Sequence, residues 1–155
     1  MIKVLFICHG NICRSPMAEF IMKDMVRKAG MEDQFLIESA ATSSEETWNG
    51  IGNPVYPPAK AELRMHGLSC DGKRARKLTK EDYDRYDLLI GMEEQNIRNI
   101  LRIVGSDPEG KVKKLLSYAG IERGIADPWY TGDFSSTYRD IEVGCKALLG
   151  HLMGR

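Results

Sequence analysis

Short apolar runs alternate along the chain with longer stretches in which apolar residues recur every three or four positions. The short runs are typical of buried strands, and they predict three of these, at 2–7, 35–37 and 88–90. A short fourth strand is predicted at 112–115. The longer stretches are typical of amphipathic helices, and they predict helices at 15–29, 58–67, 93–103 and 135–153. Strands that alternate with helices indicate an α/β fold built on a parallel sheet.

The segments between these elements are predicted to be loops and turns. Ser, Thr, Gly, Asn and Pro are frequent at 40–57, which indicates a long loop, and 121–134 is expected to be a functional loop. Gly30 is expected to end the first helix, because glycine readily adopts the backbone conformation that follows a helix. Thr79 is expected to cap a short helical turn at 80–84.

Length and charge limit what kind of protein this is. With 155 residues and 43% hydrophobic content, the chain is long enough for one domain (1–155) with a substantial core and too short for two. The formal net charge of zero gives no overall attraction to nucleic acids or membranes, so neither is expected as a partner. The basic run at 73–77 is interpreted as a solvated face rather than a nucleic-acid patch.

The cysteines and the apolar runs bear on the compartment. No signal-peptide pattern is present, and no apolar run approaches the roughly 20 residues that span a bilayer. The spacing of Cys8, Cys13, Cys70 and Cys145 does not suggest a secreted disulfide framework, so the thiols are expected to be reduced. We therefore expect a soluble, cytoplasmic protein, either a monomer or a weak dimer.

The first predicted strand leads directly into Cys8-His9-Gly10-Asn11-Ile12-Cys13-Arg14-Ser15, which Pro16 and the first helix follow. A short loop that enters a helix turns backbone N–H groups toward one point, so an anion is expected there. The same donors and the Arg14 guanidinium favour a thiolate at Cys8, and the planar guanidinium matches two oxygens of a phosphoryl group. Gly10 and Asn11 tolerate the left-handed backbone of a tight cradle. The segment predicts a phosphate-binding loop that carries a nucleophile.

The segment 4–19 resembles the signature of the low-molecular-weight protein tyrosine phosphatases, whose loop reads Cys-x-Gly-Asn-x-Cys-Arg-Ser-Pro. Further similar segments follow in family order at 37–40, 66–68, 75–79, 86–92 and 127–130, so the resemblance covers essentially the whole chain. It implies a single-domain, three-layer fold in which helices cover both faces of a four-stranded parallel sheet. It also implies hydrolysis of phosphotyrosine in proteins, and of small aryl phosphates, through a thiophosphate intermediate and without a metal or another cofactor.

The resemblance assigns the acid and the walls of the substrate slot. Asp127 is implied to protonate the leaving phenol and then to assist the attacking water, because a nucleophile alone leaves a poor leaving group. Pro128 is expected to stiffen the loop that carries it. Trp48, Trp129 and Tyr130 resemble the aromatic walls against which an aryl phosphate stacks.

Other residues are implied to support the loop. Asn11 and Ser39 resemble the hydrogen-bonded pair that holds its unusual backbone, and Ser15 resembles the hydroxyl that donates to the Cys8 sulfur. Cys13 resembles the neighbouring thiol that traps oxidised Cys8 as a disulfide, although a buried structural cysteine is an equally good interpretation.

The chain departs from the family pattern at several positions. His9 follows the nucleophile where the family often has Leu, which makes the rim of the slot more polar. Trp129 stands where the family has Tyr, and Glu93 where it has Asp, which leaves the usual contacts around the loop open. A histidine that joins the loop network in some relatives falls near Gly72 or Lys73 here.

Other functions remain open at this point. Arginine phosphatases share the loop, but an aliphatic Ile12 suits an aryl ring, whereas those relatives carry a residue that resembles Thr. Arsenate reductases of this fold need two further cysteines about seven residues apart, and Cys70 has no such companion. A zinc site made of Cys8, His9 and Cys13 lacks a second pair of ligands at finger-like spacing. A phosphate-binding domain without turnover would have no use for an acid.

Overall fold

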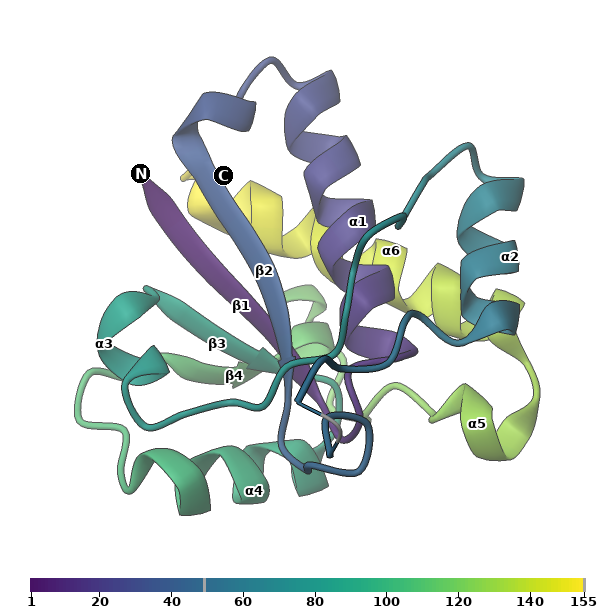
Figure 1. Ribbon diagram of the computed structural model, residues 1–155. Coiled ribbons are helices and arrows are strands. Elements are labelled where there is room, and N and C mark those ends of the chain that lie inside the picture. The colour runs from purple at the N-terminus through teal and green to yellow at the C-terminus, as the bar shows by residue number, and fades with distance from the viewer. Residues whose placement is uncertain (49, 155) are drawn as a thin grey trace.

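Four parallel strands form the centre of the computed structural model, which describes residues 1–48 and 50–154 (Figure 1). The strands are β1 (Ile2–Cys8), β2 (Phe35–Ala41), β3 (Leu88–Gly91) and β4 (Val112–Lys114), and they lie in the order β2-β1-β3-β4. All four predicted strands are confirmed, and β2 extends beyond its predicted end at Ile37 to Ala41. In the register, Cys8 lies opposite Ala41, so β1 and β2 end together.

Helices cover both faces of this sheet, as predicted. Five helices lie close to their predicted ranges: α1 (Arg14–Lys28), α2 (Pro57–Met65), α3 (Asp82–Arg85), α4 (Glu94–Val104) and α6 (Phe134–Leu152). A further short helix, α5 (Pro128–Thr131), lies within 121–134, which was predicted to be a loop. Two short 3-10 helices, η1 (Glu32–Gln34) and η2 (Leu115–Ala119), complete the set. Helices α1, α2 and α6 lie on one side of the sheet, and α3 and α4 lie on the other (Figure 1). No helix within the described residues has both the length and the apolar composition that a bilayer crossing requires.

Strand β1 has helices on both of its faces, which explains why its apolar residues are continuous from Val4 to Ile7 rather than alternating. Val4 and Phe6 face the core under α1 and α6, whereas Leu5 and Ile7 face the core under α3 and α4. All four side chains are fully buried. A strand with both faces covered needs apolar residues at every position, and that is the sequence pattern typical of parallel sheets.

The turn before α3 differs from its prediction. Thr79 does not cap that helix through its hydroxyl; instead the Asp82 carboxylate accepts a hydrogen bond from the Thr79 backbone N–H at 2.8 Å. The helix begins at Asp82. A carboxylate is a stronger acceptor than a hydroxyl, and Asp82 reaches back along the chain to satisfy the free donor.

The basic run at 73–77 is only partly the solvated face that was predicted. Arg74 is exposed, but Lys73 and Arg76 are half-buried, and both hold internal partners. Lys77 forms an isolated parallel bridge with Ala41, so this segment runs alongside the end of β2. The run is therefore built into the structure beside the carboxyl end of the sheet.

Candidate active site

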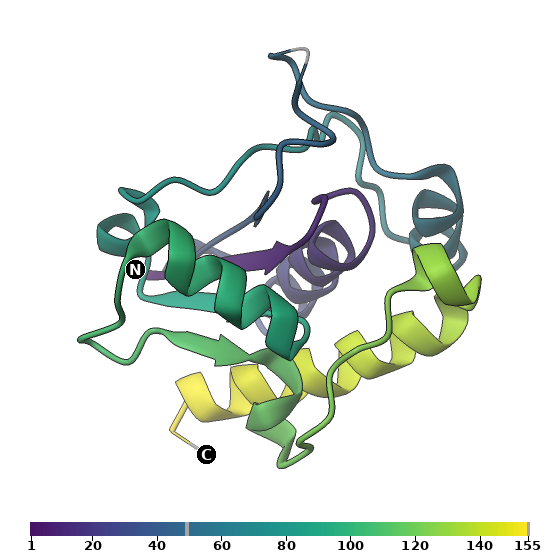
Figure 2. The same cartoon turned by 90° about the horizontal axis from the view of Figure 1, so that it is seen from below.

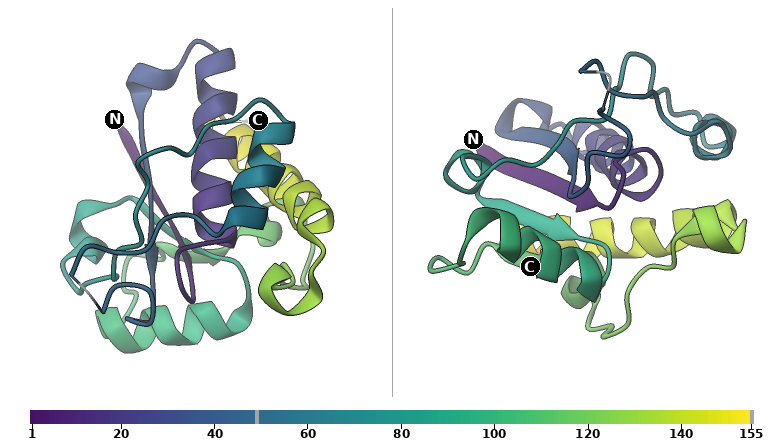
Figure 3. Two further views of the ribbon diagram at one scale, coloured as in Figure 1. Left: turned by 45° about the vertical axis from the view of Figure 1, so that its right-hand side comes forward. Right: turned by 60° about the horizontal axis from the view of Figure 1, so that its bottom comes forward.

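The loop between β1 and α1 lies at the carboxyl edge of the sheet, where the strand order changes direction. Cys8 is the last residue of β1 and Arg14 is the first residue of α1. Because β2 and β3 pair with opposite sides of β1, the loop emerges from the middle of the sheet. Figure 3 (left) shows this loop and α5 at the same end of the molecule. Such switch points are where open α/β sheets bind ligands.

Neighbouring backbone holds the loop in place. The N–H groups of Thr42 and Ser43, just after β2, donate to the carbonyls of Cys8 and His9, each at 3.0 Å. Asn11 has a φ of +59°, and it is the one non-glycine residue with positive φ in the described part of the chain. Asparagine tolerates this left-handed conformation better than most residues.

Asn11 also connects the loop to its surroundings through its side chain. Its amide nitrogen donates to Ser15 Oγ at 2.8 Å and to Ser39 Oγ at 2.9 Å. Its amide oxygen accepts from the Arg76 backbone N–H at 3.1 Å. The hydrogen bond between Asn11 and Ser39 that the family resemblance implies is therefore present, and the buried amide uses both donors and its oxygen.

Two groups approach the Cys8 sulfur from the loop itself. Ser15 Oγ lies 3.0 Å from Cys8 Sγ, and the Asn11 backbone N–H donates to the same sulfur at 3.3 Å. Hydrogen bonds donated to a sulfur stabilise its anionic form over the neutral thiol. The geometry suits a thiolate at the base of the cradle.

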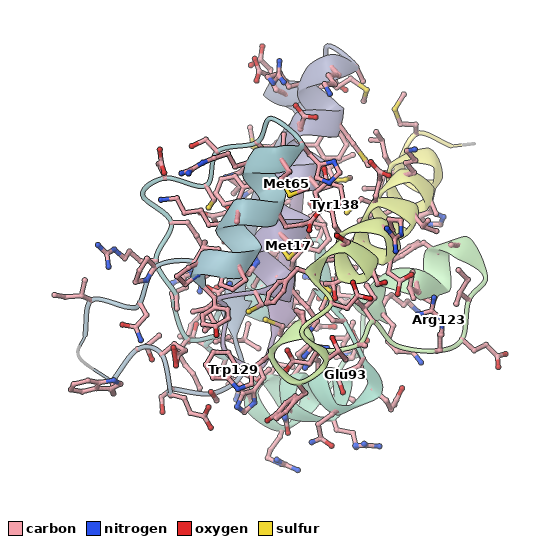
Figure 4. All side chains as sticks on the ribbon, turned by 90° about the vertical axis from the view of Figure 1, so that its right-hand side faces the viewer. Met17, Met65, Glu93, Arg123, Trp129 and Tyr138 are labelled. Atoms are coloured by element: carbon pink, nitrogen blue, oxygen red, sulfur yellow. The ribbon has the colours of Figure 1, made fainter. Side chains whose placement is uncertain are left out.

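Arg14 is almost fully buried, with 2% of its surface exposed. One guanidinium nitrogen donates to the Ile125 carbonyl at 2.8 Å and to the Glu93 carboxylate. The other terminal nitrogen lies 3.5 Å from Asp127 Oδ2. A buried charge is tolerated when it has such partners, and these partners also fix the direction of the guanidinium plane. Figure 4 shows the labelled Glu93 and Trp129 on the same, lower side of the molecule.

Asp127 reaches the loop because it begins the short helix α5. Its Oδ1 accepts from the Trp129 backbone N–H at 3.0 Å, as an N-cap does, and Pro128 occupies the first helical position. The preceding segment is held from two sides, since the Ile125 N–H donates to the Met92 carbonyl at 2.9 Å and the Thr137 hydroxyl to the Ala126 carbonyl at 3.3 Å. The cap leaves Oδ2 turned toward Arg14.

Cys8, Arg14 and Asp127 all line one cavity of about 150 Å³. The residues that line it are Cys8, His9, Gly10, Ile12, Cys13, Arg14, Glu45, Glu46, Asp127, Trp129 and Tyr130. The Trp129 ring rests on Tyr56, with ring centroids 4.7 Å apart, which fixes one wall. Two thiols, a guanidinium, three carboxylates and two aromatic side chains thus line a space suited to a phosphoryl group on an aromatic stem.

Trp48 was predicted to form a wall of the slot, but it is not among the described residues that line this cavity. Its side chain is 79% exposed. The segment after β2 projects from the body of the molecule (Figure 2), and within it the Asn53 backbone and side chain hold Glu46 at the cavity. His9 Nε2 lies 3.2 Å from Glu45 Oε2 at the rim. Of this segment, Glu45 and Glu46 rather than Trp48 line the cavity.

The second thiol of the loop has a different environment from the first. Burial, and then the nearby charge of Cys8, raise the pKa of Cys13 to about 12. Cys13 is therefore a neutral thiol under ordinary conditions. Within the described part of the chain, no three His, Cys, Asp or Glu side chains gather in an arrangement that could hold a metal ion.

Sequence reasoning missed several residues that the structure places around the loop. Glu93 was noted as a departure from the family pattern, but no partner was predicted for it. It lies 79 positions after Arg14, and no pattern in the sequence indicates that the two side chains meet. Glu19 and Lys73 are also part of the support, because Glu19 accepts from Ser39 Oγ at 2.6 Å and Lys73 donates to the Ser39 carbonyl at 3.0 Å. The spacing of Glu19, four residues after Ser15 in a helix, could have revealed it.

Comparison with known proteins agrees with this geometry. The family model described as low molecular weight phosphotyrosine protein phosphatase matches residues 3–154. The low molecular weight protein-tyrosine-phosphatase YfkJ of Bacillus subtilis is 38% identical over 98% of this chain and 96% of its own. Its crystal structure superposes with a TM-score of 0.93 at 37% identity, covering 99% of this chain and 96% of that one.

Two further relatives show how broadly the fold is shared. The low molecular weight phosphotyrosine protein phosphatase of Gallus gallus is 36% identical over 94% of this chain and 92% of its own. The drosophila arginine phosphatase DARP is 29% identical, with a TM-score of 0.86 that covers 97% of this chain and 98% of that structure. The same fold therefore occurs in proteins named for different phosphorylated side chains.

Proposed function

This chain belongs to the low molecular weight phosphotyrosine protein phosphatase family, and on that premise we propose that Cys8, Arg14 and Asp127 form its catalytic centre. It is a protein-tyrosine phosphatase whose substrates are phosphoproteins. The observation that carries the assignment of residues is that these three side chains line one small cavity at the carboxyl edge of the sheet.

In the first step the Cys8 thiolate attacks phosphorus in line with the leaving oxygen. A sulfur–phosphorus bond forms, the bond from phosphorus to the phenolic oxygen breaks, and Asp127 delivers its proton to that oxygen. The hydrogen bonds from Asn11 and Ser15 to the sulfur support this role, because they stabilise the attacking anion. Asp127 is 24% exposed at the cavity wall, where a leaving group can reach it.

Arg14 and the backbone N–H groups of the loop stabilise the phosphoryl oxygens while the bonds change. Negative charge is spread over these oxygens in the transition state, and preorganised donors lower its energy without reorganisation. Glu93 and Ile125 hold one guanidinium nitrogen, and the other terminal nitrogen lies 3.5 Å from Asp127 Oδ2 in the wall of the cavity. Arg14 is thus fixed before substrate arrives.

In the second step a water molecule releases phosphate. Asp127, now a carboxylate, takes a proton from the water while its oxygen attacks phosphorus and the sulfur–phosphorus bond breaks. The Cys8 thiolate is regenerated, and Asp127 is again protonated for the next cycle. All proton transfers use this chain's own carboxyl group.

An aromatic phosphate fits the slot better than an aliphatic one. Trp129 and Tyr130 line the cavity and are 54% and 84% exposed, so their rings can pack against a phenyl group. Ile12 adds an apolar contact at the place where a polar guanidino group would need a hydrogen-bonding partner. These contacts favour phosphotyrosine over phosphoarginine.

Cys13 is proposed as a trap for oxidised Cys8. A sulfenic acid on Cys8 would react with the Cys13 thiol to form a disulfide and release water, which prevents further oxidation. The two residues line the same cavity, and each is present as a free cysteine.

The proposal also covers the compartment and the oligomeric state of the enzyme. Free cysteines at positions 8, 13, 70 and 145 fit a reducing compartment, so the enzyme is proposed to act in the cytoplasm as a monomer or weak dimer. Sedimentation at several concentrations under reducing conditions gives the oligomeric state directly.

Hydrolysis assays with EDTA present test the proposed centre. The wild-type protein should hydrolyse an aryl phosphate and phosphotyrosine peptides faster than phosphoserine or phosphoarginine peptides. Cys8→Ser should abolish turnover and Asp127→Asn should slow it by about a hundredfold or more, whereas the matched control Cys70→Ser should leave kcat near wild type. Preference for phosphoarginine would overturn the substrate assignment. Full activity of Cys8→Ser would overturn the mechanism.

A further inference from the structure

A buried ammonium group supports the phosphate loop from behind. Lys73, in the segment that follows α2, has a side chain that is only 12% exposed. Its Nζ donates to the Ser39 carbonyl at 3.0 Å and lies 3.4 Å from Glu19 Oε1. Burial lowers the pKa of Lys73 from its usual value, and the Glu19 carboxylate opposes that shift. A long cationic side chain is therefore held inside by two specific partners.

Glu19 divides its two oxygens between different neighbours. Oε1 accepts the Ser39 hydroxyl at 2.6 Å and faces Lys73, whereas Oε2 pairs with Lys23 at 2.6 Å. Lys23 is 44% exposed, so its pairing is screened by solvent. The Lys73 contact is made on the buried side, at the oxygen that is connected to the loop.

These contacts set the direction of a chain of hydrogen bonds. Because the Ser39 hydroxyl donates to Glu19, its oxygen is left to accept from the Asn11 amide nitrogen. The second hydrogen of that nitrogen goes to Ser15 Oγ, so the Ser15 hydroxyl keeps its own hydrogen free. The neighbour of that hydroxyl is Cys8 Sγ, at 3.0 Å. The hydrogen bond from Ser39 to Glu19, at one end of this series, thus makes the Ser15 hydroxyl the donor to Cys8 at the other end.

A reversed Asn11 amide would reverse this order. Its oxygen would then face the two serine hydroxyls, and Ser15 would donate to Asn11 rather than to Cys8. The Arg76 backbone N–H opposes the reversal at one end, since it needs the amide oxygen as its acceptor. At the other end the Glu19 carboxylate opposes it, since it keeps the Ser39 hydroxyl engaged as a donor.

We infer that Lys73 is a positioning residue for the Cys8 nucleophile. Its ammonium fixes the Glu19 carboxylate and the Ser39 carbonyl together, so that the chain of hydrogen bonds ends with the Ser15 hydroxyl donating to the Cys8 sulfur. Lys73 lies outside the described residues that line the active-site cavity, and it borders a separate cavity of about 330 Å³ that Glu19 and Ser39 also line. It acts without touching substrate.

Lys73→Met is the direct test, because methionine keeps most of the stem and removes the charge. The readout is the rate at which iodoacetate alkylates Cys8, followed by mass spectrometry, together with kcat/KM for an aryl phosphate. We expect both rates to fall by about tenfold, because the thiolate loses a donor. Lys73→Arg restores a cation and should recover most of the alkylation rate.

Lys23→Met is the matched control, since it removes an ammonium from the same carboxylate but from the other oxygen. It should change the alkylation rate by less than about twofold. An equal fall of the alkylation rate in Lys23→Met and Lys73→Met would overturn the inference, because the loss of any positive charge beside Glu19 would then explain both results. An unchanged alkylation rate in a folded Lys73→Met would overturn it as well.

A double-mutant cycle with Ser39→Ala separates positioning from a loss of folding. If Lys73 acts through Ser39, Lys73→Met should have little further effect on Cys8 alkylation once Ser39 is Ala. Additive losses would contradict the inference. Its catalytic consequence rests on the proposed function, but alkylation of Cys8 needs no turnover. If the wild-type protein shows no phosphatase activity, the proposed function is refuted, but the alkylation test of Lys73 can still be carried out.

Discussion

Arg14 and Glu93 form an ion pair that joins the start of α1, which follows β1, to the start of α4, which follows β3. The same guanidinium nitrogen donates to the Ile125 carbonyl, in the segment that leads to Asp127. Glu93 also accepts from the backbone of α4 in a capping box with Asn96, which anchors its side chain. Arg14, which we propose binds the phosphate, is therefore oriented by a helix cap on a distant part of the chain.

Removing that carboxylate should impair catalysis more than folding. Glu93→Ala should lower kcat/KM by about 10- to 100-fold, because a small misplacement of Arg14 weakens its hold on the phosphoryl oxygens. Glu93→Gln keeps an oxygen acceptor and should lose less. Steady-state kinetics beside thermal melting measures both effects, and wild-type kinetics in Glu93→Ala would refute the orienting role.

Gly124, in the segment that leads to Asp127, packs closely against Glu93. A Cβ at this position would lie 2.7 Å from Glu93 Cβ and 3.0 Å from its Cα. Gly124→Ala must therefore push the segment that carries Asp127 outward, and kcat should fall by about tenfold or more. Gly150→Ala in α6, where nothing lies within 4 Å, is the control and should retain full activity. Equal kcat in the two variants would contradict the packing argument.

The two tryptophans should differ in their effect on small substrates. Trp129→Ala removes a cavity wall and should raise KM for an aryl phosphate by about three- to tenfold. Trp48→Ala should leave the same constant within about twofold, because its side chain is exposed and Trp48 is not among the described residues that line the cavity. A larger effect from Trp48 than from Trp129 would mean that the segment after β2 closes over the slot.

Alkylation should discriminate between the two loop cysteines over a wide pH range. Raising the pKa of a thiol keeps it protonated up to that pH, so Cys13, at about 12, stays neutral between about pH 6 and 9. Iodoacetate should therefore modify Cys8 and leave Cys13 largely unmodified throughout. Peptide mass spectrometry after a timed reaction measures both sites, and inorganic phosphate should protect Cys8. Rapid modification of Cys13 at neutral pH would contradict its buried, neutral state.

The architecture was predictable because the two inner strands, β1 and β3, are covered on both faces. Such strands appear in the sequence as short continuous apolar runs, and the helices between them carry a clear helical period. The proposed phosphate-binding loop could also be found in the sequence, because its residues are contiguous from Cys8 to Ser15. Features made of contiguous residues can therefore be predicted from the sequence.

The remainder of the site depends on contacts that no local pattern encodes. Glu93 meets Arg14 across 79 positions, and Lys73 meets Glu19 from within a run that looks like an ordinary solvated basic surface. Trp48 was expected in the slot because an aromatic residue in a polar loop has no core periodicity to explain it. Its position depends on the path of that loop, which hydrogen bonds such as that from Asn53 to Glu46 determine.

The central claim is that Cys8 forms a covalent thiophosphate that Asp127 helps to break. Rapid acid quenching of Asp127→Asn during turnover of an activated aryl phosphate, followed by peptide mass spectrometry, tests it most directly. An activated leaving group needs little help from the acid, so the intermediate should form and then accumulate. The account predicts one phosphoryl group on the peptide that contains Cys8 and none in Cys8→Ser. Turnover by Asp127→Asn with no phosphorylated cysteine at any time would contradict it.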